Sequence, residues 1–270
     1  MKTFTLFFLF ISMASLCYAQ NGTTQFGARA AGLGYAYSSI ADQWSALNNP
    51  GGLGYLEKTS AFAGFENKYN ISGFNSLAAG FTTKLKIGAF SATAFKFGDD
   101  LYNEQIFSLG YGNKFGIAGL GIKLNYHQYY IDEFGSKGVF SIDFGGIAEI
   151  SEQLRFGAYI RNINQAQLAE LYDERIPTYL NAGLGYLPND NITLSAEVEK
   201  ELENDPVFRM GLEYVFHKKL AIRTGIKTNA FTNYFGLGFI SQKLLIDYAL
   251  TKHQILGLSH QVGMAYIIKQ

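Results

Sequence analysis

From Thr59 to the C-terminus, apolar and polar residues alternate along the chain with a period of two. An alternating pattern predicts β-strands whose two faces meet different surroundings. In GIAGLGIKLNYHQYY, for example, Leu120, Ile122 and Leu124 fall on one face, and Lys123 and Asn125 fall on the other. Fourteen such segments follow one another, at residues 59–69, 71–83, 86–97, 102–113, 116–130, 137–150, 153–163, 178–187, 191–201, 206–217, 219–229, 232–241, 243–252 and 258–269.

The connections between these segments alternate between short and long. The short ones centre on Leu85, Lys114, Glu152, Asn189, Lys218 and Gln242, and most of the others are longer, apart from a tight turn expected near Asn70. Short periplasmic turns, longer outer loops and an even strand number are typical of bacterial outer-membrane barrels. We therefore expect an all-β fold, a 14-stranded antiparallel transmembrane β-barrel spanning residues 59–270.

A soluble β-sandwich or solenoid is the alternative. It would leave rows of Leu, Phe and Tyr on fourteen strands that the rest of the chain is too short to cover. A barrel turns that face outward to outer-membrane lipid, and its closure removes free strand edges.

The first residues carry the pattern of a secretory signal. Lys2 precedes an apolar run from Phe4 to Leu16. In the CYAQ stretch that follows, Cys17 and Ala19 occupy the small-residue positions before the cleavage point. We expect a signal peptide over residues 1–19, cleavage near Ala19 and a bacterial outer-membrane location. Cleavage would remove Cys17, the only cysteine. Because 22 basic residues balance 22 acidic ones, the charge indicates no nucleic-acid partner.

Residues 20–58 do not read as strands, and a lumen enclosed by fourteen strands needs material to fill it. We expect this stretch to form a hatch inside the barrel. A short helix is predicted from about Asp42 to Leu47, capped by Asp42 or Ser39 and ended by Pro50. Gly51, Gly52 and Gly54 are expected to turn the chain towards the first strand. The only tryptophan, Trp44, is expected to anchor the hatch.

Charged residues of both signs occupy positions predicted to face the lumen. A selective aqueous pore more often carries a ring of one sign. The balanced set favours a structural network instead, with pairing expected among neighbouring strands. Its predicted members are Lys123, Arg155, Arg161, Glu197, Arg209, Glu213, Arg223 and Asp247.

The sequence contains no arrangement of residues that is typical of a catalytic site. The four histidines have no close metal-ligand spacing, so neither a metal site nor a cofactor is expected. His127 and His217 fall at strand ends, where a solvated histidine is ordinary. Ser259 and His260 are adjacent on a strand, so their side chains point to opposite faces and cannot act together.

The segment GARAAGLGYAYSSIADQWSALNNPGGLGYLE resembles the amino-terminal segment of the FadL-type outer-membrane transporter superfamily, nearest its PorV/PorQ branch associated with type IX secretion. The C-terminal stretch also resembles that branch, through Gly236, Gly238, Asp247, Tyr248 and Ala249. Gly51 replaces the usual Ala. The residues proposed for the hatch motif are Arg29, Gly34, Asp42, Trp44, Asn49, Pro50, Gly52 and Leu53.

The resemblance implies a fourteen-stranded barrel with an internal hatch, and two functions. In the favoured one, the protein is a PorV/PorQ-like accessory of type IX protein secretion that binds secretion-system proteins. In the alternative, it is a FadL-like passive transporter of fatty acids or other hydrophobic small molecules, with a hatch that shifts to let the ligand pass.

Overall fold

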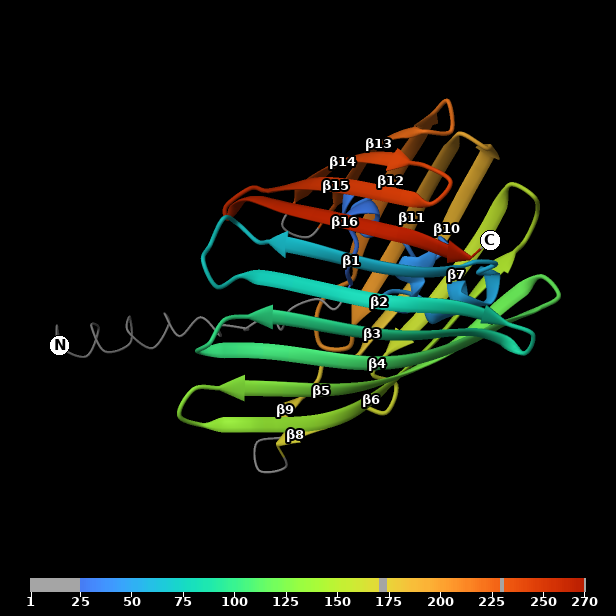
Figure 1. The fold of residues 1–270 in the computed structure, drawn as a ribbon. Helices are drawn as coiled ribbons and strands as arrows, with labels where there is room; N and C mark the ends of the chain where they lie inside the picture. The colour runs from blue at the N-terminus through green and yellow to red at the C-terminus, as the bar shows by residue number, and fades with distance from the viewer. Residues whose placement is uncertain (1–24, 170–173, 229–230, 270) are drawn as a thin grey trace, which may run out of the picture.

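The computed structural model describes residues 25–169, 174–228 and 231–269. Within these residues, fourteen strands close into one antiparallel barrel, and β8 and β9 form a separate two-stranded sheet (Figure 1). The strands of the barrel wall are β1 (Thr59–Asn67), β2 (Asn75–Leu85), β3 (Gly88–Gly98), β4 (Tyr102–Phe115), β5 (Ala118–Ile131), β6 (Gly135–Glu149), β7 (Leu154–Arg161), β10 (Tyr179–Asn189), β11 (Ile192–Glu201), β12 (Val207–Phe216), β13 (Leu220–Lys227), β14 (Thr232–Ile240), β15 (Leu244–His253) and β16 (Gly257–Lys269).

Neighbouring wall strands are consecutive in the chain, except that the β8–β9 hairpin (Gln167–Ala169 and Glu174–Arg175) lies between β7 and β10. The barrel closes where β1 pairs with β16, from Thr59 opposite Lys269 to Asn67 opposite His260. We call the end of the barrel that carries Thr59 and Lys269 the turn end, and the opposite end the loop end.

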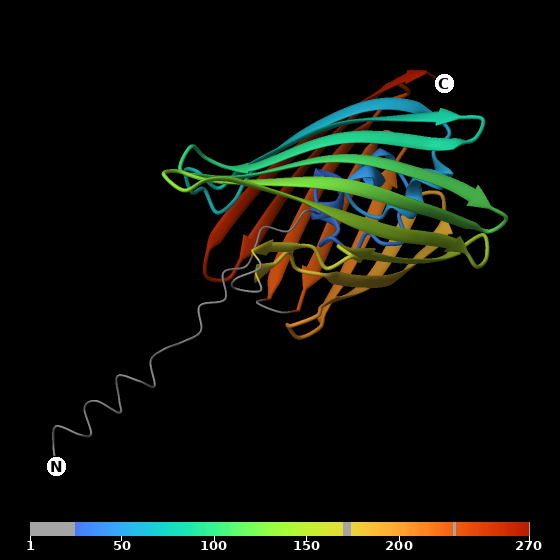
Figure 2. The ribbon, with the colours of Figure 1, turned by 90° about the horizontal axis from the view of Figure 1, so that it is seen from below.

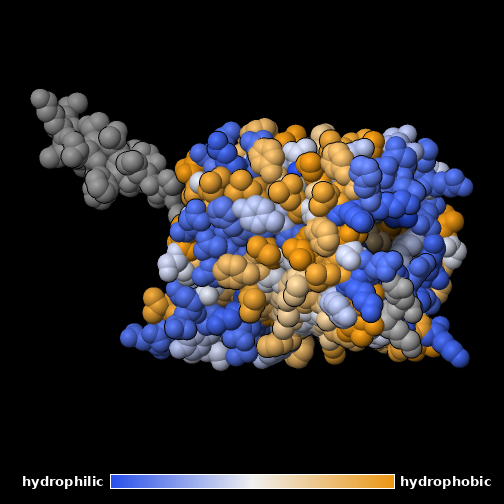
Figure 3. All heavy atoms as spheres, turned by 45° about the horizontal axis from the view of Figure 1, so that its top comes forward, coloured by the Kyte–Doolittle hydropathy of each residue, from blue (hydrophilic) through white to orange (hydrophobic). Residues whose placement is uncertain are grey.

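The outer surface of the wall is apolar, because the alternate side chains that point away from the lumen are mostly hydrophobic. Leu109 is 66% exposed, Met210 is 55% exposed and Leu237 is 59% exposed. Figure 3 shows hydrophobic residues spread over the middle of one face, with hydrophilic residues gathered towards its ends. This is the surface that a barrel presents to a bilayer.

Residues 25–56, which we call the inner segment, lie within the barrel (Figure 2). The segment consists of helix α2 (Ala28–Gly32) and two 3-10 helices, η1 (Gln43–Ala46) and η2 (Pro50–Tyr55). Helix α2 packs against β13 to β16, and η2 packs against β3 to β7. The inner segment therefore reaches across the lumen from one side of the wall to the other.

The strand predictions agree with the structure to within a few residues, with one larger difference. The second strand begins at Asn75 rather than at residue 71, because residues 68–74 form a loop closed by hydrogen bonds between Lys68 and Phe74 and between Ile71 and Lys68. A tight turn does form at Tyr69 and Asn70, but the whole connection between the two strands is longer than predicted.

The predicted signal peptide and residues 20–24 of the predicted hatch lie outside the described residues. Among the helices that the structure describes, none has the length and apolar character needed to cross a bilayer.

Candidate functional site: the inner segment and an adjoining cavity

Asp42 caps helix η1, as expected, but η1 is a 3-10 helix and spans only Gln43–Ala46. The Asp42 side chain accepts from the Trp44 N–H at 2.8 Å, and the Ser45 hydroxyl accepts from the Asp42 N–H at 3.2 Å. This reciprocal pair is a capping box, formed here with Ser45 in place of the usual Glu or Gln. The cap fixes where the chain turns inside the lumen.

The glycines after Pro50 have a different role from the predicted one. Residues 50–55 form η2, and none of Gly51, Gly52 and Gly54 has a positive φ angle. They allow close approach instead: a Cβ on Gly51 would lie well under 3.0 Å from the Gly146 backbone of β6, and one on Gly54 would lie 2.7 Å from the Asn113 carbonyl oxygen of β4. The inner segment thus touches the wall backbone to backbone.

Two adjacent asparagines hold the segment in different ways. Asn48 bonds within the segment, since its amide donates to the carbonyl oxygens of Phe26 and Trp44, at 2.9 Å each. Asn49 accepts from the Gly51 N–H and donates to the Gly146 carbonyl oxygen of β6 at 3.0 Å. Both side chains are fully buried, so each bond replaces one that water would otherwise make.

Trp44 lies in an aromatic cluster inside the barrel and is 1% exposed. Its ring centroid lies 4.7 Å from that of Phe62 on β1 and 6.1 Å from that of Phe26. Phe26 in turn contacts Phe95 of β3 edge to face, at 5.7 Å. The cluster joins the inner segment to two wall strands.

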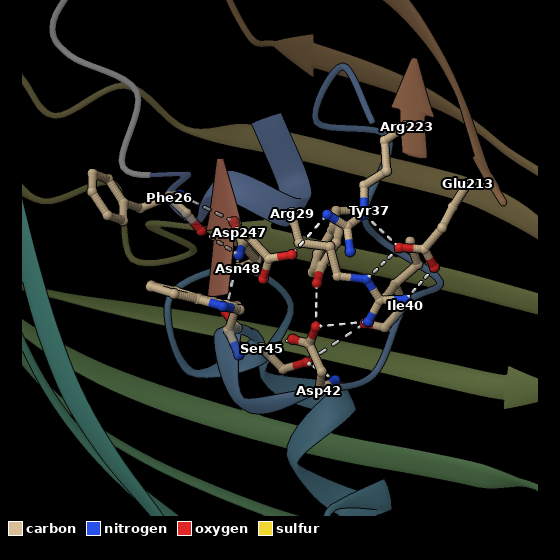
Figure 4. A network of polar contacts seen from close by, with 11 residues as sticks. Phe26, Arg29, Tyr37, Ile40, Asp42, Ser45, Asn48, Glu213, Arg223 and Asp247 are labelled. Atoms are coloured by element: carbon tan, nitrogen blue, oxygen red, sulfur yellow. Dashed lines mark hydrogen bonds and ion pairs between the residues drawn. The ribbon is translucent and has the colours of Figure 1, made fainter. Parts of the chain in front are cut away.

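A first charge network links the inner segment to β12, β13 and β15. The Arg29 guanidinium binds Glu213 of β12 through Nη2 at 2.6 Å and Nε at 3.0 Å, and it binds Asp42 through Nη1 at 3.0 Å (Figure 4). Arg223 bridges Glu213 at 2.5 Å and Asp247 at 2.7 Å. Three carboxylates therefore face two guanidinium groups, and Arg29 is the member that belongs to the inner segment.

The Tyr37 hydroxyl donates to the Asp42 carboxylate, as Figure 4 also shows. Burial raises the pKa of Tyr37 well above its ordinary value, and the Asp42 charge adds to this effect. The hydroxyl therefore keeps its proton and remains a donor to the network.

A second network is centred on Glu199, which accepts from Arg161 at 3.0 Å and from Arg209 at 2.6 Å. Glu197 lies 3.8 Å from Arg209 and accepts from the backbone N–H groups of Tyr37 and Ser38, at 2.9 and 2.7 Å. Glu197 thus holds the inner segment by its backbone.

The charged residues predicted for the lumen network belong to two separate networks and two further pairs. Glu213, Arg223 and Asp247 belong to the first network, and Arg161, Glu197 and Arg209 belong to the second. Lys123 pairs with Asp143 at 3.2 Å, and Arg155 pairs with Glu149 at 3.1 Å. Arg155 is 30% exposed and lies at the turn end, outside both networks.

A cavity of about 40 Å³, continuous with open space at its mouth, lies in the lumen towards the loop end. Its lining combines apolar residues with polar ones. The apolar members are Leu47 of the inner segment, Phe95, Ile106, Ile176 and Pro177, and the polar members include Glu104, Lys123, Asn125, His127, Ser141, Asp143, Arg161 and Asn162.

His127 is not at a solvated strand end, as the sequence suggested, but is 5% exposed and lines this cavity. Its Nε2 lies 2.7 Å from the Ser141 hydroxyl of β6. Strand β5 continues past His127 to Ile131, so His127 lies within the strand, on the same face as Lys123 and Asn125. Ser259 and His260 do face opposite ways: Ser259 accepts from the Tyr69 N–H, whereas His260 contacts the Tyr248 hydroxyl.

Among the described residues, no group of three or more His, Cys, Asp or Glu side chains is arranged to hold a metal ion.

Solved structures share this fold. The P. putida toluene transporter TodX aligns with a TM-score of 0.71 over 92% of this chain and 100% of its own, at 10% sequence identity. The Ralstonia pickettii toluene transporter TbuX aligns with a TM-score of 0.68 over 90% of this chain and 97% of its own, at 13% identity. This chain has their fold.

A more distant similarity extends to the Acinetobacter baumannii outer membrane protein Omp33, with a TM-score of 0.52 over 78% of this chain and 98% of its own, at 7% identity. No protein-family model and no curated protein sequence matches the chain. At these identities the similarity describes the barrel. It supports the fold that the FadL-type resemblance implies and carries no information on the PorV/PorQ branch.

Proposed function

We propose that this protein is an outer-membrane barrel that lets small hydrophobic compounds pass, with the inner segment as its hatch. The observation that carries the proposal is the partly apolar cavity between the wall and the inner segment. The shared fold with two toluene transporters and the apolar outer surface of the wall support it. The proposal takes the alternative function of the sequence analysis in preference to the favoured one.

The arrangement of the lumen argues against an open pore. The inner segment reaches from β13–β16 to β3–β7 and touches the wall through glycines, buried amides and ion pairs. In the proposed mechanism, the segment shifts to connect the cavity with the turn end. The Arg29–Glu213 ion pair then acts as a latch, because it joins the segment to β12 only while the segment is seated.

The secretion-accessory function rests on sequence resemblance, and no contact in the structure favours it. It makes a distinct prediction, namely that secretion-system proteins copurify from native outer membranes while hydrophobic compounds are not taken up.

The proposal can be tested by tying the inner segment to the wall. A Cβ built on Gly263 of β16 lies 3.5 Å from the Ala28 Cβ of α2, which is within the range of about 3.5–4.5 Å found in disulfides. The chain has no cysteine other than Cys17, so an Ala28→Cys/Gly263→Cys variant contains only the designed pair after signal cleavage. Uptake of radiolabelled toluene is measured in Gram-negative cells that lack their own channel for it.

We expect uptake above the vector control for the native protein, loss of uptake in the oxidised double variant, and recovery after reduction. The two single-cysteine variants control for the side chains, in particular for crowding of Trp44 by a new Cβ on Gly263. Equal uptake before and after reduction, with the cross-link confirmed by mass, would show that passage does not need the segment to move. No uptake by the native protein would refute passage itself.

A further inference from the structure

The cavity carries a hydrogen-bonding atom that the protein leaves without a partner. His127 is 95% buried, given its 5% exposure, and its Nδ1 makes no hydrogen bond to any described residue. The imidazole is held in place on its other side by Ser141, at 2.7 Å from Nε2, and it stacks on Tyr129 with an interplanar angle of 6°. A buried polar atom left without a partner costs about 1–3 kcal/mol, so its presence calls for an occupant.

The polar side chains next to His127 are already hydrogen-bonded to one another. The Ser108 hydroxyl donates to the Asn125 Oδ1 at 2.7 Å, and the Asn125 amide donates to the Ser141 hydroxyl at 3.1 Å. This chain orients Ser141 towards His127. In either tautomer of the imidazole, Nδ1 remains to donate to a ligand oxygen or to accept from a ligand hydroxyl. A hydroxyl group suits both cases, because it can act as donor and as acceptor.

The charges around the cavity argue against an anionic ligand such as a fatty acid. Each cation of the lining already has a carboxylate: Lys123 has Asp143 at 3.2 Å, and Arg161 has Glu199 at 3.0 Å. Glu104 adds a negative charge and forms no ion pair with any described residue, although the Tyr102 hydroxyl donates to it at 2.5 Å. A ligand carboxylate would therefore enter without a cation to receive it.

The opposite side of the cavity offers apolar surface. Phe95 is 7% exposed and Ile106 is 6% exposed, and Leu47 contributes from the inner segment. Ile176 and Pro177, which precede β10, also line the cavity. Asn162 contacts this part of the chain: its amide donates to the Ile176 carbonyl oxygen at 2.7 Å and its Oδ1 accepts from the Ala166 N–H at 2.9 Å.

From these contacts we infer that the cavity binds a small, neutral, mainly apolar molecule bearing one hydroxyl group, with the hydroxyl on the His127 Nδ1. The inference rests on the proposed passage of small compounds and narrows their class. It distinguishes this cavity from one for plain hydrocarbons, since Nδ1 would stay without a partner beside toluene.

The test compares two probes of nearly equal size, p-cresol and p-xylene, which differ by a hydroxyl in place of a methyl group. Binding to the native protein in lipid nanodiscs is measured by equilibrium dialysis, with empty nanodiscs subtracted and free concentrations read from the dialysate. The variants are His127→Phe, which removes both ring nitrogens, and His127→Asn, which keeps a polar atom near the position of Nδ1. His260→Phe is the matched control, because His260 lies on the wall away from the cavity lining.

We expect His127→Phe to weaken p-cresol binding about tenfold, as the loss of one buried hydrogen bond implies, without weakening p-xylene binding. His127→Asn should retain most of the p-cresol affinity, and His260→Phe should change neither probe. The carboxylate p-toluate should bind the native protein more weakly than p-cresol. Equal loss for both probes in His127→Phe, or no loss for p-cresol, would overturn the assignment.

Binding and passage are read separately, so the two proposals fail in different ways. If cells take up toluene while p-cresol binding does not depend on His127, passage stands and the hydroxyl site is wrong. If p-cresol binds through His127 while no compound is taken up, the cavity is a binding site and passage is wrong. Should His127→Phe fail to fold, His127→Leu, which also lacks both ring nitrogens, takes its place with the same expected loss for p-cresol alone.

Discussion

Replacing Arg29 with Met should release the inner segment while leaving the barrel wall intact. The guanidinium makes three charged hydrogen bonds, two to Glu213 and one to Asp42, at 2.6–3.0 Å. Its side chain is 25% exposed, whereas Glu213 is 4% exposed. Removing one partner of a buried ion pair costs about 3–5 kcal/mol, and the partial exposure of Arg29 puts the expected cost near 3 kcal/mol.

A loss of about 3 kcal/mol raises the population of the released segment roughly 100-fold. Trp44 is the only tryptophan and lies in the inner segment, so its fluorescence reports the segment alone, while far-ultraviolet circular dichroism reports the strands. In Arg29→Met, the emission of Trp44 should shift to longer wavelength at a lower temperature than in the native protein, with the dichroism transition nearly unchanged.

Arg155→Met is the matched control, because the same substitution there breaks a partly exposed pair with Glu149 at the turn end, beside a cation–π contact with Tyr55 at 5.9 Å. Such a pair contributes about 0–1 kcal/mol, so the Trp44 transition should stay close to that of the native protein. The reasoning fails if Arg29→Met and Arg155→Met give the same Trp44 transition, or if the Trp44 and dichroism transitions of Arg29→Met move together.

Three further predictions concern the seat of the inner segment. Gly51→Ala should expose Trp44, because its methyl group would collide with the Gly146 backbone. Gly146→Ala should have a smaller effect, because its methyl group lies 3.0 Å from the Leu120 side chain. The wavelength of Trp44 emission at 25 °C distinguishes the two variants. Phe62→Ala should destabilise the segment by about 3–5 kcal/mol, with outward-facing Phe156→Ala as the control, and a similar Trp44 midpoint in both variants would contradict this. The pKa of Tyr37 is higher in the folded protein than in the unfolded chain, so its contribution to stability is present below about pH 10 and is lost as the pH rises further. In a pH titration of Trp44 emission, Tyr37→Phe should therefore show less release of the inner segment at alkaline pH than the native protein. Identical titrations would exclude this role.

The strands could be predicted from the sequence because each one lies between two unlike environments. The two environments produce an alternating pattern within each strand's own sequence, as in Leu120, Lys123 and Leu124 of β5, and this pattern does not depend on distant partners. The cap at Asp42 was likewise predictable, because its hydrogen bonds run to Trp44 and Ser45 next to it.

The remaining features depend on residues that meet only across the lumen. Arg29 and Glu213 are 184 positions apart, and nothing near either residue indicates the other. Gly51 looked like a turn residue because its contact with Gly146 is invisible in the sequence. His127 looked like an ordinary strand-end histidine because the residues that line the cavity with it, such as Ile176 and Pro177, are distant in the sequence.

The position of helix α2 has a consequence for the order in which the molecule is assembled. The inner segment leads directly into β1, yet α2 packs against β13 to β16, which are the last strands to be synthesised. The seam between β1 and β16 is also the one that joins the two ends of the wall. A chain that stops before β13 therefore lacks the seam partner, the strands against which α2 packs, and Arg223, which pairs with the Glu213 carboxylate that binds Arg29. Closure of the cylinder and docking of its contents thus depend on the same final stretch of polypeptide, which makes the closing step a check that synthesis is complete.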